Sequence, residues 1–222
     1  MRRAQVLPVI HVLDVAQAVR NAQLAFDNGA DGVFVISMDG RDDELDGVAC
    51  HLKSRWPDRF IGVNYLTVAP LAALERSLLF GLDGTWTDKP GVTSQGAGDQ
   101  AHLIRELLLR HPKHKFFGSV AFKYQPADLD PAKAAVNAAS LGMVPTTSGT
   151  ATGVAPSVTK VAAMRRALGR HEPLALASGL TPENVGVLAL YLTHLLVSTG
   201  VSRSFHEFDA DLLARFVAAV PK

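Results

Sequence analysis

The sequence predicts an α/β fold, a (β/α)8 TIM barrel formed as one compact domain, on three observations. Short apolar runs alternate with longer segments of helical period along the 222 residues. The runs number eight and are apolar on both faces, which indicates a parallel sheet covered on both sides. Eight regular units favour a closed barrel over a doubly wound open sheet, and no low-complexity linker divides residues 1–222.

The predicted strands are short runs rich in Val, Ile, Leu and Phe, as expected of buried β-structure. In chain order they cover residues 5–12, 31–37, 59–66, 82–88, 115–124, 142–148, 173–178 and 194–199. Amphipathic segments lie between and after them, with apolar residues at i, i+3, i+4 and i+7. The clearest of these helical segments cover residues 14–29, 100–111, 130–142, 157–171 and 209–220.

Capping residues mark the ends of several predicted helices. Asp130 followed by Pro131 is the pattern of an N-cap and a first-turn proline. Gly29 and Gly142 follow the last periodic residues of their segments and predict helix ends. Cys50, the one cysteine, lies within a helical pattern and is expected to be an inert core thiol.

Composition and charge exclude some classes of partner. Lys and Arg number 22 against 21 Asp and Glu, so no global basic surface for nucleic acid is expected. No apolar stretch approaches the length of a membrane span, and the first residues lack the pattern of a secretory signal. We therefore expect a cytoplasmic protein, and the sequence leaves open whether it forms a homo-oligomer.

In such a barrel, functional residues lie at the carboxyl ends of the strands. The candidates for catalysis there are His11, Asn64, Asp88 and Lys123. Lys123 could form a Schiff base, act as a general acid or base, or hold an anion as a fixed cation; the alternative is an outward, solvated lysine. Asp88 at the end of the adjacent strand is expected to keep the amine protonated, or else to cap a turn. Asn64 and His11 could orient or shuttle protons, or could satisfy the backbone locally.

Two glycine turns predict a phosphate site. The stretches Ser178–Gly179 and Ser198–Thr199–Gly200 follow the seventh and eighth predicted strands, where barrels commonly bind phosphate through backbone N–H groups. Each glycine could instead serve only a tight turn. The hydroxyl-rich residues Thr147, Ser148 and Gly149 after the sixth strand could add to this site, although they lack the lysine of a P-loop.

Two other polar clusters are assigned no function. Asp39, Asp42, Asp43 and Glu44 match no metal-binding loop, so we expect a solvated acidic loop and helix start, and no metal site. The histidines of residues 111–115 precede the fifth strand, on the end of the barrel that serves stability.

The motifs GSVAFKYQPADLDPAKAA, TSGTATG, ASGLTPENV and LLVSTGVSR, in this order, make the chain resemble the BtpA-like family of phosphate-binding barrels. More distantly it resembles phosphoribosylanthranilate isomerase. The resemblance implies phosphate loops at Gly179 and Gly200 and a fifth-strand lysine at Lys123. It departs from the isomerase at His11 and at Thr146 or Thr147, where that family has its acid–base pair, and the BtpA-like loop after the first strand is short here.

Three functions are consistent with these residues. The first is an enzyme without a cofactor that acts on a small phosphorylated metabolite, such as a sugar phosphate or phosphoribosyl compound, by isomerase or lyase chemistry. The second is a phosphate-ligand-binding or assembly protein without turnover, favoured by the short first loop. The third is a metal-dependent hydrolase, which would need clustered histidines where only His11 stands.

Overall fold

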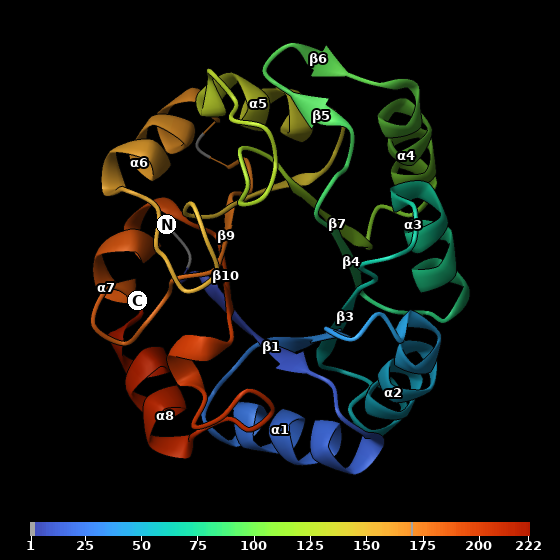
Figure 1. The fold of residues 1–222 in the computed structure, drawn as a ribbon, viewed down its shortest axis with the longest axis vertical. Coiled ribbons are helices and arrows are strands. Elements are labelled where there is room, and N and C mark those ends of the chain that lie inside the picture. The colour runs from blue at the N-terminus through green and yellow to red at the C-terminus, as the bar shows by residue number, and fades with distance from the viewer. Residues whose placement is uncertain (1–2, 170) are drawn as a thin grey trace.

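The computed structural model describes residues 3–169 and 171–222, and within them eight parallel strands close into a barrel surrounded by helices (Figure 1). The predicted fold class is confirmed. The barrel strands are β1 Gln5–His11, β2 Gly32–Ile36, β3 Phe60–Asn64, β4 Gly84–Thr87, β7 Lys115–Ser119, β8 Val144–Thr147, β9 Ala175–Ala177 and β10 His194–Val197. β1 pairs with β10 and closes the ring.

The helices follow their strands around the outside of the barrel. They are α1 Val15–Asp27, α2 Asp42–Arg55, α3 Pro70–Leu79, α4 Asp99–Arg110, α5 Pro131–Ser140, α6 Val158–Ala167, α7 Val185–Leu188 and α8 Ala210–Ala219. Two 3₁₀ turns, η1 Ala189–Tyr191 and η2 Thr199–Val201, flank β10, and a small hairpin joins β5 Val92–Thr93 to β6 Gly96–Ala97. The sequence analysis assigns no strand to the residues of this hairpin.

The predicted helix ends are confirmed by the capping geometry. The Asp130 side chain accepts a hydrogen bond from the backbone N–H of Lys133, and Asp14 caps α1 in the same way through Gln17. Gly29 and Gly142 have φ of 85° and 77°, the left-handed conformation that ends a helix at little cost for glycine.

Apolar residues form two layers. One packs the helices against the outside of the strands, and the other fills the barrel with the rings of Phe34, Phe117 and Trp86. Phe34 packs edge-on against Phe117, with ring centroids 5.1 Å apart. Gly62 makes room for Phe34, because a Cβ atom there would lie 2.4 Å from the phenyl ring. The barrel interior is therefore a packed core below the ends of the strands.

All eight barrel strands are shorter than predicted, and in the fifth this changes how a site residue is presented. The fifth barrel strand, β7, ends at Ser119 rather than continuing to residue 124. Ala121 and Tyr124 have positive φ, 46° and 60°, which no strand allows. Lys123 therefore lies on a loop, and strand alternation does not determine where its side chain points.

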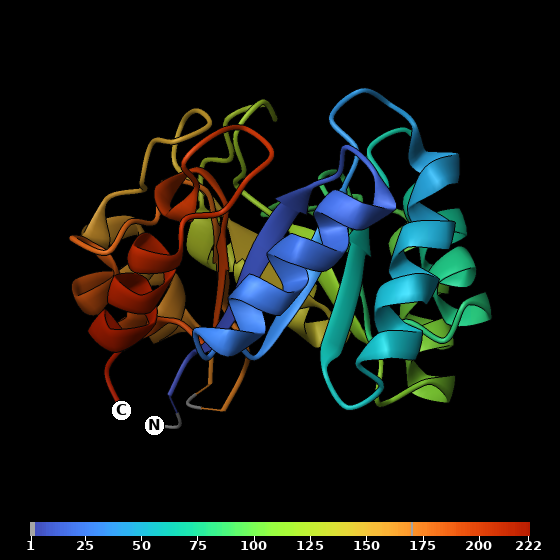
Figure 2. The same cartoon turned by 90° about the horizontal axis from the view of Figure 1, so that it is seen from below.

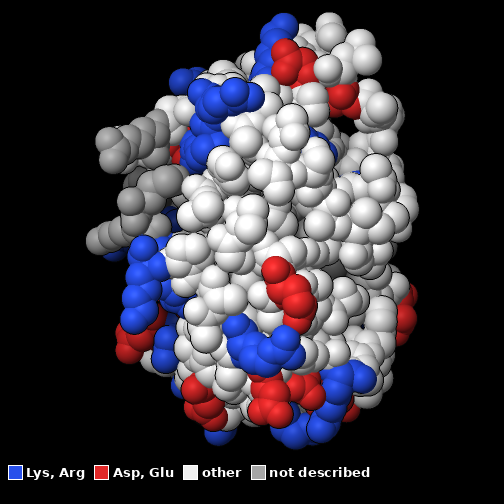
Figure 3. Space-filling model, turned by 90° about the vertical axis from the view of Figure 1, so that its left-hand side faces the viewer, with Lys and Arg blue, Asp and Glu red and all other residues white. Residues whose placement is uncertain are grey.

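The two ends of the barrel differ in what they carry. Figure 2 shows the C-terminus at the end where the strands begin and the longest loops at the opposite end. On the side formed by α6, α7 and α8, charged residues of both signs lie mainly toward the top, the bottom and the left of the view, around a broad area without charged side chains (Figure 3). No helix in residues 3–169 and 171–222 has the length and apolar character to cross a membrane.

Candidate functional site

A cavity of about 300 Å³ opens where the barrel strands end. Every barrel strand, or the loop that follows it, contributes to its wall. The predicted site residues that line it are His11, Asn64, Asp88, Lys123, Ser178, Gly179, Ser198 and Thr199. The cavity therefore brings together the proposed catalytic side chains and parts of both glycine turns.

Asp88 and Lys123 reach this cavity from neighbouring units of the barrel. Asp88 directly follows β4, and Lys123 belongs to the loop after β7, which pairs with β4. No ion pair joins them among the described residues; the Lys123 Nζ atom instead donates to Thr152 Oγ1 at 3.1 Å. The predicted contact between the Asp88 carboxylate and the Lys123 amine is therefore not formed, and the two groups interact only through their charges.

The protonation of these two groups follows from burial. Burial raises the pKa of Asp88, while the positive charge of Lys123 acts in the opposite direction. Burial likewise lowers the pKa of Lys123, and Asp88 counters this. Each group is moved toward its neutral form, so their pKa values approach one another and favour proton exchange with a ligand between them.

Asn64 ends β3 beside Asp88 and is 1% exposed. Its Nδ2 atom makes a long contact of 3.5 Å with Asp88 Oδ1. Its Oδ1 atom is buried and has no hydrogen-bond partner in the described part of the chain. A buried acceptor without a donor is costly, so this oxygen is an unsatisfied group beside the cavity.

His11 ends β1 on another side of the cavity. Its Nδ1 atom lies 3.0 Å from the carbonyl oxygen of Phe205, and its Nε2 atom lies 3.4 Å from Ser198 Oγ. Burial lowers the pKa of His11, and His206 and Lys123 act in the same direction, while the hydrogen bond to the Phe205 carbonyl opposes them. The imidazole is therefore neutral near pH 7.

The two predicted phosphate loops lie against each other. A Cβ atom on Gly200 would lie 1.9 Å from the carbonyl oxygen of Leu180, so these loops pack with no room for a side chain. Gly179 has φ of 73° and abuts the backbone of Ala155 in the loop after β8. Both glycines therefore allow close packing of the loops, and of the two only Gly179 is among the residues that line the cavity.

The backbone N–H groups of these loops remain available to a ligand. Those of Gly179, Leu180, Thr199 and Gly200 donate to no acceptor within the residues that the structure describes. Ser178 and Ser198 also line the cavity. This concentration of donors suits an anion.

The hydroxyl-rich stretch after β8 has a different role from the one predicted. Thr147 and Ser148 are fully buried, and neither they nor Gly149 line the cavity. Ser148 Oγ accepts a hydrogen bond from the backbone N–H of Lys123 at 2.7 Å, and Thr147 Oγ1 donates to the Ala121 carbonyl. These residues support the loop that presents Lys123.

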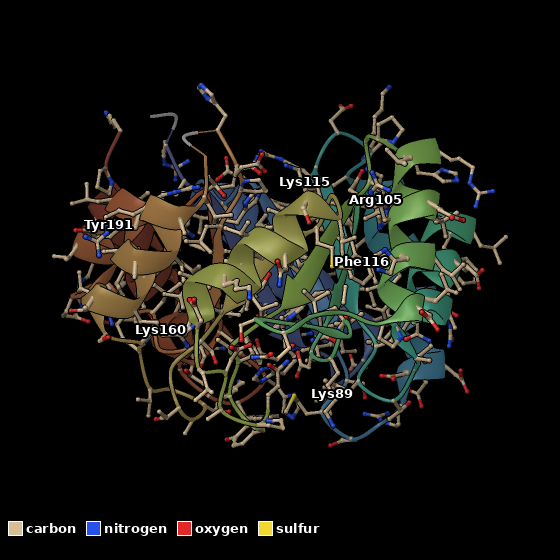
Figure 4. All side chains as sticks on the ribbon, turned by 90° about the horizontal axis from the view of Figure 1, so that it is seen from above. Lys89, Arg105, Lys115, Phe116, Lys160 and Tyr191 are labelled. Atoms are coloured by element: carbon tan, nitrogen blue, oxygen red, sulfur yellow. The ribbon has the colours of Figure 1, made fainter. Side chains whose placement is uncertain are left out.

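Lys160 of α6, absent from the sequence-based candidates, holds this support together. Its Nζ atom donates to the carbonyls of Ala121 at 2.6 Å and Ser148 at 2.8 Å, linking the loops after β7 and β8. Figure 4 shows it toward the same end of the barrel as Lys89 and away from Lys115. The signal in the sequence is a lysine in the first turn of a helix, where the macrodipole disfavours a cation.

Other lining residues also escaped the sequence-based prediction. Phe205, Tyr124, Met38 and Leu66 contribute exposed apolar surface around the cavity. Tyr124 and Met38 lie within two residues of a predicted strand or site residue, whereas Phe205 reaches the cavity through a loop that folds back.

Of the acidic residues after β2, Asp42 starts α2 but is buried rather than solvated, and accepts two hydrogen bonds from Thr67. The described residues hold no cluster of three or more potential metal-binding His, Cys, Asp or Glu side chains.

The fold is similar to solved structures over nearly its whole length at low sequence identity. The structure of native KDPGal covers 99% of this chain and 95% of its own, with 15% identity and a TM-score of 0.71. Phosphoribosyl anthranilate isomerase in complex with reduced 1-(o-carboxyphenylamino)-1-deoxyribulose 5-phosphate covers 97% of each chain, with 16% identity and a TM-score of 0.66. KGPDC from Streptococcus mutans also covers 97% of each chain, with 11% identity and a TM-score of 0.68.

No protein-family model matches the chain, and no curated protein matches it. At identities this low, the similarity to solved structures establishes the barrel fold. Membership of the BtpA-like family stays a prediction.

Proposed function

We propose that the protein is an enzyme that acts on a small phosphorylated metabolite, a sugar phosphate or phosphoribosyl compound, by proton transfer. The observation that carries this proposal is that the half-buried side chains of Asp88 and Lys123 line one cavity, whose wall also includes loops with unpaired backbone N–H groups. Among the proteins of similar fold is an isomerase named for a phosphoribosyl compound, in complex with a derivative of deoxyribulose 5-phosphate. It supports the phosphorylated class of substrate.

The proposed chemistry assigns each group a separate task. The phosphate binds the N–H groups of residues 179–180 and 199–200, and the rest of the ligand extends toward Asp88 and Lys123. The Asp88 carboxylate takes a proton from a carbon next to a carbonyl group, the electron pair of the C–H bond moves onto the carbonyl oxygen, and the Lys123 ammonium stabilises the negative charge that develops there. Asn64 accepts a hydrogen bond from a ligand hydroxyl.

The test is a screen of phosphorylated aldoses, ketoses and phosphoribosyl compounds for turnover, with and without a chelator. We expect turnover that survives chelation and falls by about 10²- to 10⁴-fold in Asp88→Asn, the range typical of a lost acid–base group. Asp58→Asn, which makes the same change at an exposed carboxylate before β3, is the matched control and should keep its rate. Activity that disappears with chelator and returns with zinc would support a hydrolase instead.

Lyase chemistry through a Schiff base is separated from proton transfer by trapping. Incubation with a carbonyl substrate and borohydride, followed by mass spectrometry, leaves a permanent adduct only if the Lys123 amine attacks the carbonyl. Burial lowers the pKa of that amine and so favours attack, whereas the charge of Asp88 and the hydrogen bond to Thr152 Oγ1 favour the ammonium. We expect no adduct. An adduct on Lys123 would make the protein an aldolase-type lyase.

A non-catalytic ligand-binding or assembly protein is the second candidate, and one observation favours it. Only residues 12–14 separate β1 from α1, so the loop that could close over the ligand at this point is short. Saturable binding of ribose 5-phosphate without turnover of any compound in the screen would support this function.

A further inference from the structure

The loop of residues 202–208, between η2 and α8, folds across the end of β1 and makes backbone contacts with His11. The carbonyl oxygen of Phe205 lies 3.0 Å from His11 Nδ1, and the His206 Nδ1 atom lies 3.0 Å from the His11 carbonyl oxygen. The Phe205 ring also packs at a tilt against the His11 imidazole, with centroids 4.4 Å apart. Loop 202–208 therefore contacts both the ring and the backbone of His11.

Two buried amide side chains of α1 hold loop 202–208 in this position. Gln17 is 0% and Asn21 is 1% exposed, which is unusual for amides in a helix that otherwise packs apolar residues inward. Gln17 Nε2 donates to the carbonyls of His206 and His11. Asn21 Nδ2 donates to the His206 carbonyl at 2.7 Å, and Asn21 Oδ1 accepts from the N–H of Phe208 at 3.1 Å.

These contacts account for the polar atoms of both amides. The remaining oxygen, Gln17 Oε1, accepts from the N–H of Leu13 at 3.1 Å. A buried amide costs free energy unless its donors and acceptors are satisfied, and here all partners belong to the end of β1 or to loop 202–208. The two side chains therefore fasten this loop to the strand that carries His11.

The position of the Phe205 carbonyl decides which ring nitrogen of His11 carries the proton. A carbonyl oxygen only accepts, so the Nδ1 atom of the contact must be an N–H. In the neutral ring, Nε2 is then a bare acceptor. It faces Ser198 Oγ at 3.4 Å, and both side chains line the cavity. The titratable groups that act on His11 are His206 in loop 202–208 and Lys123 from the loop after β7.

We propose that loop 202–208, fastened by Gln17 and Asn21, selects the Nδ1–H tautomer of His11 and so makes its Nε2 atom a proton acceptor of the cavity. In the absence of a ligand, the Ser198 hydroxyl is the hydrogen-bond partner of the Nε2 atom. When ligand binds, a ligand O–H bond breaks, its electron pair stays on the oxygen, and the proton forms an N–H bond at Nε2. The Nδ1–H of the resulting imidazolium stays on the Phe205 carbonyl.

This inference rests on the proposed function for the ligand, and it adds a second proton-transfer position. β1 and β4 stand three places apart in the barrel, so His11 and Asp88 approach a ligand from different sides. Interconversion of an aldose and a ketose moves one proton between carbons and another between oxygens. Asp88 then handles the proton on carbon and His11 the proton on oxygen. Gln17 and Asn21 are positioning residues, since they act through loop 202–208.

The test measures the tautomer directly in the full chain, without any ligand. Long-range proton–nitrogen NMR spectra of protein labelled with ¹⁵N-histidine distinguish a protonated ring nitrogen from a bare one. We expect a single Nδ1–H tautomer for His11 in the wild type. A wild-type His11 with its proton on Nε2 would overturn the proposal, whether or not the protein turns over a phosphorylated compound.

The variant Asn21→Asp keeps the acceptor for Phe208 and removes the donor to His206. We expect a mixture of His11 tautomers and, where the screen has found a substrate, turnover lowered by about 10- to 100-fold at unchanged KM, with a shifted pH profile. Gln23→Leu, at an exposed position of the same helix, is the control and should leave the tautomer unchanged. If Asn21→Asp kept the wild-type tautomer and pH profile, loop 202–208 would not select the tautomer. If this variant fails to fold, the spectrum of the wild type still decides the question.

Discussion

The two ends of the barrel use polar side chains in opposite ways. At the end where the strands begin, polar groups are paired within the protein. Lys115 Nζ lies 3.3 Å from His194 Nε2, and His114 joins the Thr85 hydroxyl to the Leu82 carbonyl. His114 and Lys115 thus take part in hydrogen bonding at the end of the barrel where the strands begin. These hydrogen bonds stabilise the end of the barrel where the strands begin, which we call the closed end.

At the cavity end, by contrast, strain and unsatisfied groups accumulate. Asn64 Oδ1 and Thr87 Oγ1, at the ends of β3 and β4, are buried without a partner among the described residues. The described non-glycine residues with positive φ, Ala121, Tyr124 and Ser178, all lie in loops at this end. Such features persist where the surrounding structure enforces them, and they gather at functional sites. The comparison teaches that the same strands carry stability at one end and ligand chemistry at the other.

The largest effect is expected from substituting a lysine at each end of the barrel. Lys123→Met should lower turnover by about 10²- to 10⁴-fold and weaken binding of ribose 5-phosphate, because it removes the ammonium of the cavity. Lys115→Met, at the start of β7, should leave both unchanged and alter the free energy of unfolding by about 1–2 kcal/mol, because His194 loses its donor. Calorimetric titration and urea unfolding of both variants measure this. A loss of binding in Lys115→Met would remove the distinction between the ends.

The next effect concerns the glycine that packs the phosphate loops. Gly179→Ala should lower the free energy of unfolding by about 3 kcal/mol or more, because its Cβ atom would lie 2.1 Å from the Ala155 nitrogen at a φ of 73°. Gly153→Ala is the matched control, with φ of 79° and nothing within 4 Å, and should cost only about 1–2 kcal/mol. Equal losses would mean that backbone conformation alone, and not packing of the loops, requires Gly179.

A smaller effect concerns pH and the closed end. Burial lowers the pKa of His194 from its ordinary value of 6.5 to about 3, with the charge of Lys115 acting in the same direction. Between these values the unfolded chain binds a proton here that the folded chain does not, so stability is lost as pH falls from 6.5 toward 3. The limiting slope is about 1.4 kcal/mol per pH unit. Urea unfolding of the wild type and His194→Gln across this range should show a shallower slope in the variant; equal slopes would contradict the role of His194.

The smallest effect separates a buried contact from a surface one. Arg3→Ala removes an ion pair with Asp31 whose side chains are both about one-third exposed, and should change the free energy of unfolding by less than about 1 kcal/mol. Asp31→Ala should cost about 1–3 kcal/mol, because Asp31 Oδ2 also accepts from the N–H of Val6 at 2.8 Å. Thermal unfolding of the two variants compares them, and a larger loss in Arg3→Ala would reverse the order.

The barrel could be predicted because its signals are local and repeated. Apolar runs, helical period and caps such as Asp130 each depend on neighbouring residues. The position of a residue at the end of a predicted strand was enough to place it in the site. His11, Asn64 and Asp88 were predicted in this way, and all three line the cavity. Lys123 also lines the cavity, but it lies on a loop and not on the predicted strand. The sequence could not predict this, because alanine and tyrosine do not indicate the positive φ that Ala121 and Tyr124 adopt.

The rest of the site depends on contacts between distant segments. Lys160 ties together two loops that only the folded barrel brings close. Phe205 contacts His11 although 194 residues separate them in the sequence. The contact depends on Gln17 and Asn21, which hold loop 202–208 against the end of β1. No periodicity or turn pattern encodes such contacts, so a single sequence could not give them.

The most direct test of the division between the two ends is an NMR titration of ¹⁵N-labelled protein with ribose 5-phosphate, with ribose as the control. Saturable shifts are predicted for the backbone amides of Gly179, Leu180, Thr199 and Gly200, while those of Lys115 and His194 stay in place and ribose has no comparable effect. Shifts centred on the end of the barrel where the strands begin, or an equal response to ribose, would contradict a phosphate site in the cavity.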